Sequence, residues 1–466
     1  MIELNDPAPR AVLRFLLCCA MLMASGAYAA LSSNVQEHKL GNGMRVIVKE
    51  DHRAPVAVSM VWYKAGSMDE TSGTTGVAHV LEHMMFKGTE TVPGGEFSKI
   101  IAAAGGRDNA FTSRDYTAYF QQLHKSKLPL ALKLEADRMR NLLLPREEFE
   151  KEIRVVMEER RWRTEDKPRS LVYEQLMATA YQAHPYRHPI IGWMGDLENM
   201  DVQDTRAWYD KWYAPGNAVL VVVGDVEAKE VFKLAEENFG SIPAKPAPER
   251  KAPQEPKQTG VKRVTVKAPA ELPYLMMAWH APILRDPDKD WEPYALDILA
   301  GVLDGHDAAR LNRSLVREQQ LASSIGVSYD TTARGPGMFL IEGVPAQGKT
   351  VAELEAAVRA ELERIIREGV SEEELKRVKA QVIADEVYKR DSMFYQAMQI
   401  GQMETAGLSY KAIDTLVEKL KQVTPEQVQR IARATFQDDQ LTVAVLDPQP
   451  LQGKKPGPAP RGGRHG

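Results

Sequence analysis

The chain has 466 residues, of which 44% are hydrophobic and 27% charged, and its formal net charge is −4. This is a globular composition in a chain too long for one compact core, so two or more domains are expected. The small net charge gives no sign of a nucleic-acid-binding protein.

The N-terminus has the pattern of an export signal. Arg10 and Arg14 precede an apolar run at residues 15–24, and the Ala-Tyr-Ala sequence at residues 27–29 is typical of a signal-peptidase cleavage site. A membrane anchor is the alternative, but the run is shorter than the roughly 20 residues that cross a membrane. We therefore predict a signal peptide at residues 1–29.

Both cysteines of the chain, Cys18 and Cys19, lie in this predicted signal peptide. The mature protein would then contain no cysteine and need neither disulfides nor a reducing compartment. We expect export to a bacterial periplasm, or secretion, and no integral membrane span in the mature chain.

The segment GVAHVLEHMMFKGT, residues 76–89, places two histidines and a glutamate in an apolar, helix-like run. His79 and His83 are four residues apart, so on a helix both imidazoles can reach one metal ion. Glu82 borders the same helix face. The order H-x-x-E-H is the motif of the inverzincin zinc peptidases, although hydrogen-bonded core histidines could share this spacing.

The segment DNAFTSRDYTAYF follows a Gly-Gly turn and alternates in the manner of a strand. Residues 109–113 are expected to form an edge strand beside the histidines. An ordinary sheet strand without a binding role is the simpler alternative.

An acidic helix is expected at residues 147–166, EEFEKEIRVVMEERRWRTED. Catalytic zinc usually takes three protein ligands, so a third must come from outside the H-x-x-E-H motif. Glu152 and Glu159 are seven residues apart and share one face of this helix. Composition alone would favour a solvated acidic face.

Three segments together carry a family resemblance: HVLEHMMFKGT, GGRDNAFTSRDYTAYF and EKEIRVVMEERRW. Their order and spacing resemble the pitrilysin, insulysin and mitochondrial processing peptidase family of zinc metallopeptidases. The resemblance covers both halves of the chain. It implies an α+β fold of two homologous domains, each a mainly antiparallel sheet packed with helices, which face each other as a clamshell.

The resemblance also implies the zinc site. His79, His83 and Glu159 match the family's ligands for one Zn²⁺ per chain, and Glu82 matches its general base. Glu159 lies 76 positions beyond His83, with Glu158 as the neighbouring alternative. In this chemistry the base takes a proton from water as the water attacks a peptide carbonyl.

Further roles follow from the same resemblance. Glu152 matches an acidic residue beside the ligands, where a carboxylate would orient a ligand histidine. Asn109, Ala110 and Phe111 would pair with an extended peptide, and backbone pairing predicts broad specificity. Phe86 and Phe111 are candidates for lining the site, although either could equally be a core residue.

A second histidine pair is less promising. His184 and His188 have ligand-like spacing, but Pro185 and Pro189 prevent the helix that would align them. We therefore expect no second metal site there.

The proline-rich segment at residues 241–260 is the clearest domain boundary. The stretches at 202–225 and 425–448 each read as a helix, an aromatic residue, a turn and a buried strand, which indicates a duplication. The predicted divisions are a zinc-binding catalytic domain at 30–243, a linker at 244–262, a non-catalytic homologous domain at 263–448 and a disordered tail at 449–466.

Amphipathic helices are expected at residues 351–368 and 371–393 of the second half. The second of these begins with the capping-box pattern Ser371-x-x-Glu374.

The second half lacks an H-x-x-E-H motif and has only His306 in the corresponding helix. In relatives that are active by themselves, this half usually supplies an arginine followed by a tyrosine, and both contact the substrate. Arg317 matches the arginine, whereas Ser323 stands in place of the tyrosine. We therefore predict the zinc subunit of a heterodimer whose sister subunit supplies an Arg/Tyr pair. A homodimer in which Tyr329 substitutes is the alternative.

Together these features predict a zinc-dependent endopeptidase that hydrolyses extended peptides or unfolded segments. The alternative is a metal-free scaffold subunit of the same fold, although such subunits usually lack part of the ligand set.

Overall fold

The structure is a computed structural model that describes residues 34–251 and 253–451. The predicted signal peptide and almost all of the predicted tail lie outside these residues.

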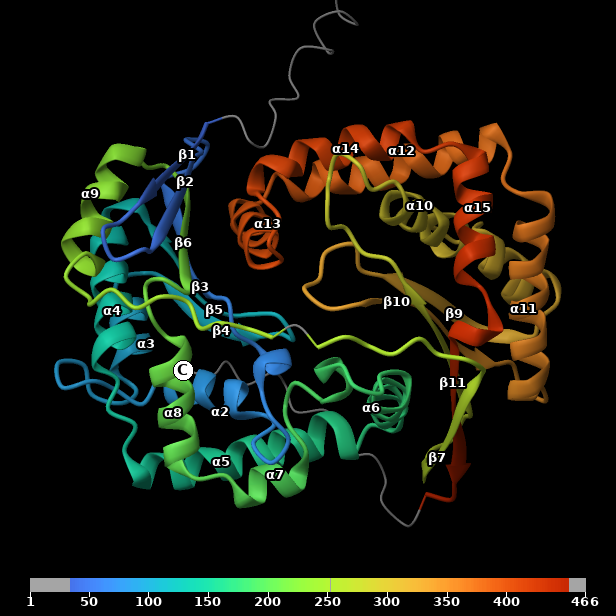
Figure 1. Ribbon diagram of the computed structural model, residues 1–466, viewed down its shortest axis with the longest axis horizontal. Helices are drawn as coiled ribbons and strands as arrows, with labels where there is room; N and C mark the ends of the chain where they lie inside the picture. Colours follow the sequence, from blue (N-terminus) through green and yellow to red (C-terminus); the bar gives the residue numbers. More distant parts are fainter. Residues whose placement is uncertain (1–33, 252, 452–466) are drawn as a thin grey trace, which may run out of the picture.

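Two sheets organise the chain, one in each half (Figure 1). The first sheet contains β1 (Val35–Lys39), β2 (Arg45–Glu50), β3 (Val56–Tyr63), β4 (Arg107–Thr112), β5 (Thr117–His124) and β6 (Ala218–Gly224). The second contains β7 (Lys262–Pro269), β8 (Tyr274–Ala281), β9 (Ala322–Tyr329), β10 (Gly337–Pro345) and β11 (Leu441–Gln449).

Helices pack around both sheets. Those of the first half are α2 (Val77–Met84), α3 (Glu96–Ala103), α4 (Leu128–Asn141), α5 (Arg146–Arg160), α6 (Pro168–Ala180), α7 (Met194–Asn199), α8 (Val202–Trp212) and α9 (Ala228–Phe239). Those of the second half are α10 (Glu292–Asp304), α11 (Val351–Glu368), α12 (Glu372–Lys389), α13 (Met393–Thr405), α14 (Ile413–Gln422) and α15 (Pro425–Thr435).

The two sheets have the same topology. The first has the strand order β1-β2-β6-β3-β5-β4 and the second β7-β11-β8-β10-β9. If β1 is left aside and the strands of each sheet are numbered along the chain, both sheets have the same order: the first strand lies next to the fifth, then come the second, the fourth and the third. In both sheets the first and fifth strands are parallel and the other pairs are antiparallel. The predicted α+β fold of two similar, mainly antiparallel halves is therefore confirmed.

The central strands are apolar along their whole length because both faces of the sheet are covered. Every residue of β6, AVLVVVG, is buried, and so are all residues of β8 except His280. The helix and strand predicted near the end of each half correspond to α8 and β6, and to α15 and β11.

Each half lends a helix to the sheet of the other. Helix α13 of the second half packs on β3 and β6, and α6 of the first half packs on β7, β8 and β11 (Figure 1). One hydrophobic cluster therefore combines Trp62 and Val221 of the first sheet with Ile400 of α13 and Met277 of the second sheet. The halves share a core and do not merely touch.

Close approach between α13 and the first sheet depends on a glycine. A Cβ atom at Gly401 would overlap the indole of Trp62, and that indole is completely buried. Any larger residue at position 401 would push the helix away from the sheet.

The helices predicted in the second half are present, with one difference. Helix α11 has the predicted bounds, whereas α12 ends at Lys389 and not at residue 393. Ser392 accepts a hydrogen bond from the backbone N–H of Tyr395 and caps a new helix, α13. The sequence pattern predicts one continuous helix up to residue 393, and the capping serine instead starts a second helix there.

The proline-rich segment between the sheets is extended and held by charged side chains. Arg250 Nε donates to Asp69 Oδ1 at 2.9 Å. The Glu255 carboxylate accepts hydrogen bonds from the backbone N–H groups of residues 182–184. The segment is thus anchored to the first half on its way to the second sheet.

Candidate metal centre

Helix α2 carries the H-x-x-E-H motif and begins at a buried carboxylate. Gly76 adopts a φ of 91°, and a Cβ there would lie 2.6 Å from the carbonyl oxygen of Ile191, so only glycine fits. Because glycine has no side chain to cap the helix, Glu70 accepts hydrogen bonds from the backbone N–H groups of Gly76 and Ala78, at 2.8 and 2.9 Å. This contact fixes the start of the helix that presents both histidines.

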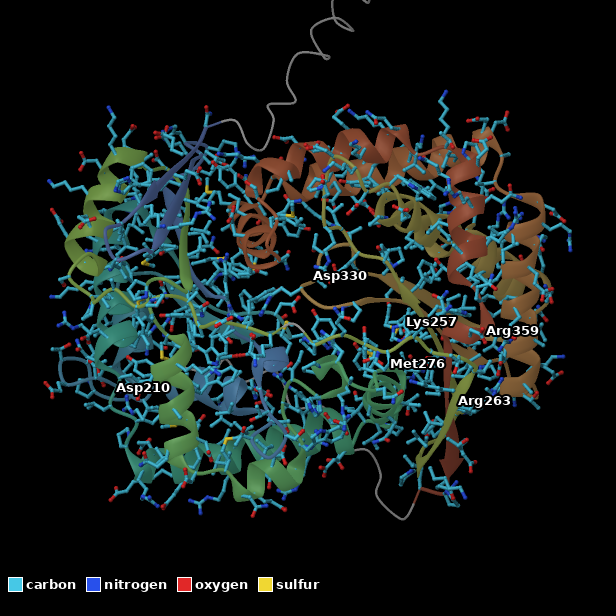
Figure 2. The ribbon with its side chains drawn as sticks, viewed as in Figure 1. Asp210, Lys257, Arg263, Met276, Asp330 and Arg359 are labelled. Carbon is cyan, nitrogen blue, oxygen red and sulfur yellow. The ribbon has the colours of Figure 1, made fainter. Side chains whose placement is uncertain are left out.

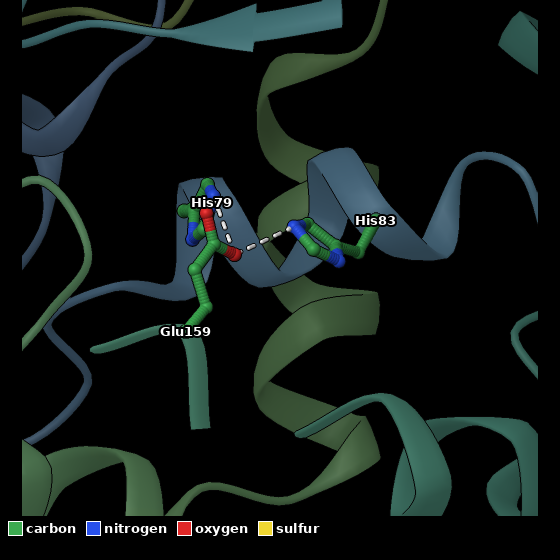
Figure 3. Close-up of side chains that lie close together, drawn as sticks. All are labelled: His79, His83 and Glu159. Carbon is green, nitrogen blue, oxygen red and sulfur yellow. Dashed lines mark ion pairs between the residues drawn. The ribbon is translucent and has the colours of Figure 1, made fainter. Parts of the chain in front are cut away.

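The structure brings together the three side chains that the family resemblance names as ligands. The Nε2 atoms of His79 and His83 lie 3.8 and 3.4 Å from Glu159 Oε2 (Figure 3). One possible ligand atom from each residue lies within 4.8 Å of the other two. Within the described residues, these three side chains form the cluster of metal-ligand residue types that could hold a metal ion.

The donor set fits zinc. Two imidazole nitrogens and a carboxylate oxygen are typical of a catalytic zinc site, which leaves a further position open. Atoms bound to one tetrahedral zinc at about 2.0–2.1 Å are separated from each other by roughly 3.3 Å. The separations of 3.4 and 3.8 Å are close to this value.

Glu152 contacts His83 on the side of the ring that faces away from Glu159, and Lys87 pairs with Glu152. His83 Nδ1 lies 2.8 Å from Glu152 Oε1, and Lys87 Nζ lies 2.5 Å from Glu152 Oε2. When Nδ1–H donates to Glu152, the lone pair of Nε2 faces Glu159. His79 is buried, and its Nδ1 has no hydrogen-bond partner among the residues that the structure describes.

Burial and neighbouring charges shift the pKa values of the residues in this cluster. Burial lowers the pKa of His79 to about 3, so this imidazole is neutral. Burial would also lower the pKa of His83, but hydrogen bonds to Glu152 and Glu159 outweigh it and raise the pKa to about 9. Burial would raise the pKa of Glu152 and Glu159, but His83, with Lys87 beside Glu152 and with His79 and Arg163 beside Glu159, outweighs it and lowers each pKa to about 2. A metal ion would therefore replace a proton on His83.

Glu82 lies beside the cluster with its carboxylate oriented by the edge strand. The hydroxyl of Thr112, the last residue of β4, donates to Glu82 Oε2 at 2.5 Å. Burial raises the pKa of Glu82, although this hydrogen bond opposes the shift. A carboxylate with a raised pKa is a better proton acceptor in catalysis near neutral pH.

The end of α5 fixes Glu159. The helix continues into a π-helical turn, Arg161–Glu165. Arg160 forms a buried, two-pronged ion pair with Glu174 of α6, at 2.8 and 3.0 Å. Arg163 Nη1 lies 2.7 Å from Glu159 Oε1, opposite the oxygen that faces the histidines.

A cavity of about 730 Å³ opens over this cluster. Its walls include the predicted catalytic and ligand residues, the outer strand β4 with Asn109, Ala110 and Phe111, and Phe86. Strand β4 pairs only with β5, so within the described chain its other edge has no strand partner. The cavity can therefore accept an extended chain along this edge.

Arg317 does not line this cavity. It lies in the π-helical segment Asn312–Glu318 of the second half, where its guanidinium is 3.4 Å from Asp307. Ser323 donates a weak hydrogen bond to the Val344 carbonyl, and Tyr329 donates to the carbonyl of Pro282. Neither residue lines the cavity over the histidines.

The second histidine pair, His184 and His188, at which no metal site is expected, makes ordinary hydrogen bonds. His184 Nδ1 accepts from the backbone N–H of Tyr186, and His188 Nδ1 accepts from the indole N–H of Trp193. A short 3₁₀ turn over Pro185–Arg187 separates the two histidines.

Sequence reasoning missed Thr112, Lys87 and Arg163, which contact Glu82, Glu152 and Glu159. One of them, Arg163, had a usable signal. Arg163 lies four residues beyond Glu159 in the helical turn that continues α5, so the two share a face. Lys87 lies four residues beyond His83, but α2 ends at Met84, so Lys87 reaches Glu152 from the turn after the helix. Thr112 meets Glu82 only through tertiary packing.

None of the helices in the described ranges is both long enough and apolar enough to span a membrane.

Comparison with known proteins agrees with this architecture. Residues 45–193 match the family model for insulinase, peptidase family M16, and residues 199–382 match the model for the peptidase M16 inactive domain. The chain is 33% identical to a Helicobacter pylori protein named zinc protease PqqE, over 93% of this chain and 98% of that protein. It is 27% identical to a Bacillus subtilis protein named uncharacterized zinc protease YmxG, over 89% of this chain and 98% of the relative.

Solved structures show the same fold. The crystal structure of a protease from Helicobacter pylori superposes with a TM-score of 0.83 at 30% identity, covering 89% of this chain and 99% of the other. With both family models, full-length relatives named zinc proteases and a shared two-domain fold, the chain belongs to peptidase family M16, the insulinase family.

Proposed function

We propose that this protein is a zinc-dependent endopeptidase. His79, His83 and Glu159 would hold one Zn²⁺, and Glu82 would be the general base. The observation that carries the proposal is the meeting of two imidazole nitrogens and a carboxylate oxygen within 4.8 Å, in the cavity that also contains a free strand edge.

Each side chain has a defined task in this proposal. Zinc held at the site would act as a Lewis acid that polarises a peptide carbonyl and acidifies water. Glu82 accepts the proton of the attacking water and then delivers it to the leaving amine. Thr112 keeps one Glu82 oxygen engaged, which leaves the other for proton transfer. Glu152 is a positioning residue, because it fixes the tautomer and orientation of His83.

The substrate would lie along β4. An extended peptide that pairs with residues 109–111 passes the cluster, and its side chains meet Phe86 and Phe111 on the cavity wall. Main-chain pairing requires an extended or unfolded segment and reads little of its sequence. The substrates would therefore be extended peptides or unfolded segments.

A second chain would complete substrate binding. Within one chain Arg317 is outside the cavity, and Ser323 stands where the family pattern has a tyrosine. We therefore propose that this is the zinc subunit of a heterodimer whose sister subunit supplies an Arg/Tyr pair. The alternative is a homodimer in which Tyr329 or another group takes the place of the missing tyrosine.

The N-terminal pattern supports a proposal of export. Residues 1–29 would be removed as a signal peptide, and the mature protein would reside in the periplasm or outside the cell. In the mature chain, residues 30–243 would form the catalytic domain, 244–262 the linker and 263–448 the non-catalytic domain.

Replacing Glu82 by glutamine tests the catalytic assignment. The variant retains the three proposed ligands, so we expect one zinc per chain, measured by atomic emission. Peptide hydrolysis should fall by roughly 100- to 10,000-fold, because the proton acceptor is lost. A fluorogenic peptide assay on zinc-loaded protein measures this.

Two further variants complete the test. Glu158→Gln changes the exposed neighbour that pairs with Arg161 and should keep both zinc and activity, whereas Glu159→Gln should lose zinc. If the wild type binds no zinc and hydrolyses no peptide, the metal-free scaffold alternative is favoured.

A further inference from the structure

A second cavity of about 320 Å³ adjoins the one over the histidines. Four residues line both cavities: Arg114, Tyr173, Met177 and Ile190. The far wall of the second cavity belongs to the second half, with Tyr329 and residues 336–338 among its lining. Asp330, another lining residue, lies near the middle of the molecule between the two halves (Figure 2). The space along β4 thus continues from the metal site toward the other half.

Arg114 stands at the boundary of the two cavities with most of its donors unused. Its Nη2 donates to the Tyr173 hydroxyl at 2.9 Å, and its Nε is buried without a hydrogen-bond partner. The guanidinium lies 5.7 Å from the ring centroid of Tyr173 and 5.6 Å from that of Tyr186. No ion pair joins Arg114 to a carboxylate within the described residues.

Two of the other cations on the wall of the first cavity are paired with carboxylates, and the third, Arg187, is exposed to solvent and donates to the Gln182 carbonyl. Lys87 pairs with Glu152, and Arg163 pairs with Glu159. Arginine has five N–H donors and stays charged, and a shielded guanidinium without an anion is costly. Arg114 is therefore a shielded cation with unused donors and, among the described residues, no carboxylate in direct contact, which leaves it able to bind a further anion.

The carboxylates near Arg114, Asp115 and Asp330, attract the guanidinium without forming an ion pair with it and are hydrogen-bonded to other groups. Asp115 accepts hydrogen bonds from the Tyr186 hydroxyl and the backbone N–H of Arg334. Asp330 accepts from the backbone and hydroxyl of Thr332. The same contacts hold the Tyr186 ring rigidly, because its hydroxyl also accepts from the backbone N–H of Gly335 at 2.8 Å. The arginine thus rests on a fixed aromatic platform.

We propose that Arg114 binds a carboxylate of the peptide substrate. This inference rests on the proposed peptidase function and adds a specificity to it. Thr112, which touches Glu82, is the last residue of β4, and Arg114 lies in the turn that follows it. The carboxylate would therefore belong to a part of the peptide that runs past the end of β4, a short way along the chain from the scissile bond. A guanidinium can bind it with two parallel hydrogen bonds.

The carboxylate could come from an acidic side chain or from the C-terminus of the peptide. Both present the same planar anion, so the probes must separate them. We would use fluorescein-labelled ten-residue peptides of alanine, glycine and serine, in which one glutamate is moved through the sequence. Each peptide is paired with its glutamine analogue, and each is made as a free acid and as a C-terminal amide.

Binding is measured by fluorescence anisotropy with zinc-loaded Glu82→Gln protein, so that no turnover is needed. We expect glutamate at one position, or a free C-terminus, to bind roughly 10- to 100-fold more tightly than its uncharged analogue. Adding Arg114→Gln should abolish this preference and leave the affinity of the uncharged peptides unchanged. Arg114→Lys should retain part of it, since lysine keeps the charge but not the planar fork.

A matched control is Arg169→Gln, which makes the same change of net charge at an exposed arginine over Tyr274, outside both cavities. It should keep the preference. Loss of the glutamate preference identifies a side-chain carboxylate, and loss on amidation identifies the chain end. If Arg114→Gln weakens charged and uncharged peptides equally, Arg114 is only structural and the inference is overturned.

Circular dichroism and zinc content establish that each variant is folded. If Arg114→Gln does not fold, Arg114→Lys on the same peptide pairs decides, because an unchanged preference contradicts the two-pronged contact. Hydrolysis by the wild type separates the two proposals. Selective binding without hydrolysis would contradict only the peptidase function, and hydrolysis without an Arg114-dependent preference would contradict only this inference.

Discussion

Glu152 connects a proposed metal ligand to the rest of the protein. One carboxylate oxygen meets His83 Nδ1 at 2.8 Å, and the other meets Lys87 Nζ at 2.5 Å. The carboxylate therefore holds the imidazole orientation that points Nε2 toward Glu159. Such outer partners often change metal affinity strongly although they never touch the metal.

Glu152→Gln is expected to weaken zinc binding by roughly 10- to 100-fold, because the amide is a poorer acceptor for His83 Nδ1–H and no longer pairs with Lys87. Competition with a chromophoric chelator measures the zinc affinity. Glu150→Gln, an exposed position on the same helix, is the matched control and should leave the affinity unchanged. Equal affinities for the wild type and Glu152→Gln would rule out the positioning role.

For single residues, the sequence predicted a contact best where the two residues are only a few positions apart in one helix. The four-residue separation of His79 and His83 places them on one helical face whatever the surrounding fold. Glu159 came from the family resemblance, since no periodicity links it to α2. Thr112 and Arg114 carried no recognisable signal, because their contacts with Glu82 and Tyr173 form across different elements.

Among the elements, α13 shows how one small residue permits an exchange between the halves. The helix packs on β3 and β6 of the first sheet, and Gly401 lies against the indole of Trp62. The amphipathic pattern of the second half predicted a helix that ends at residue 393, where α13 begins, so α13 itself was not predicted. The pattern also could not indicate that the buried face would meet the sheet of the other half.

Gly401→Ala is expected to destabilise the protein by about 1–3 kcal/mol, because a methyl group there overlaps Trp62 and the helix must shift. Thermal unfolding followed by circular dichroism measures the change as a lower midpoint.

The matched control is Gly195→Ala in helix α7, where a Cβ atom has open space. It should leave the midpoint unchanged or raise it slightly, since alanine favours helix more than glycine does. A Gly401→Ala midpoint equal to that of the control would contradict tight packing of α13 on the sheet.

At the scale of the whole molecule, the exchanged helices tie the two halves into one unit. Helix α6 covers the second sheet and α13 the first, and Arg334 of the second half forms a two-pronged ion pair with Asp69 of the first, at 2.8 and 3.1 Å. Arg317 does not line the cavity over His79, His83 and Glu159 in this arrangement. This agrees with the proposal that a second subunit supplies the arginine and tyrosine at the metal site.

We expect the chain purified alone to have weak peptidase activity, and a sister subunit to raise kcat/KM by about 10- to 100-fold through better positioning of substrate. Light scattering after size-exclusion chromatography gives the mass, and a fluorogenic peptide gives the activity.

Two outcomes would change the proposal. Full activity in a dimer of this chain, lost in Arg317→Gln, would favour the homodimer. Full activity as a monomer would contradict any partner contribution.

The sequence by itself determined the helix with the paired histidines, the acidic helix after it and the likeness of the two halves, because helix and strand periods and turn residues are local properties. The matching strand orders of the two sheets bear out that likeness. Only the tertiary structure decided which side chains meet across elements: Glu159 with the histidines, Thr112 with Glu82, and each exchanged helix with the opposite sheet. Those contacts depend on how buried faces pack in three dimensions, and a hydrophobic pattern shows that a face is buried without showing against which partner.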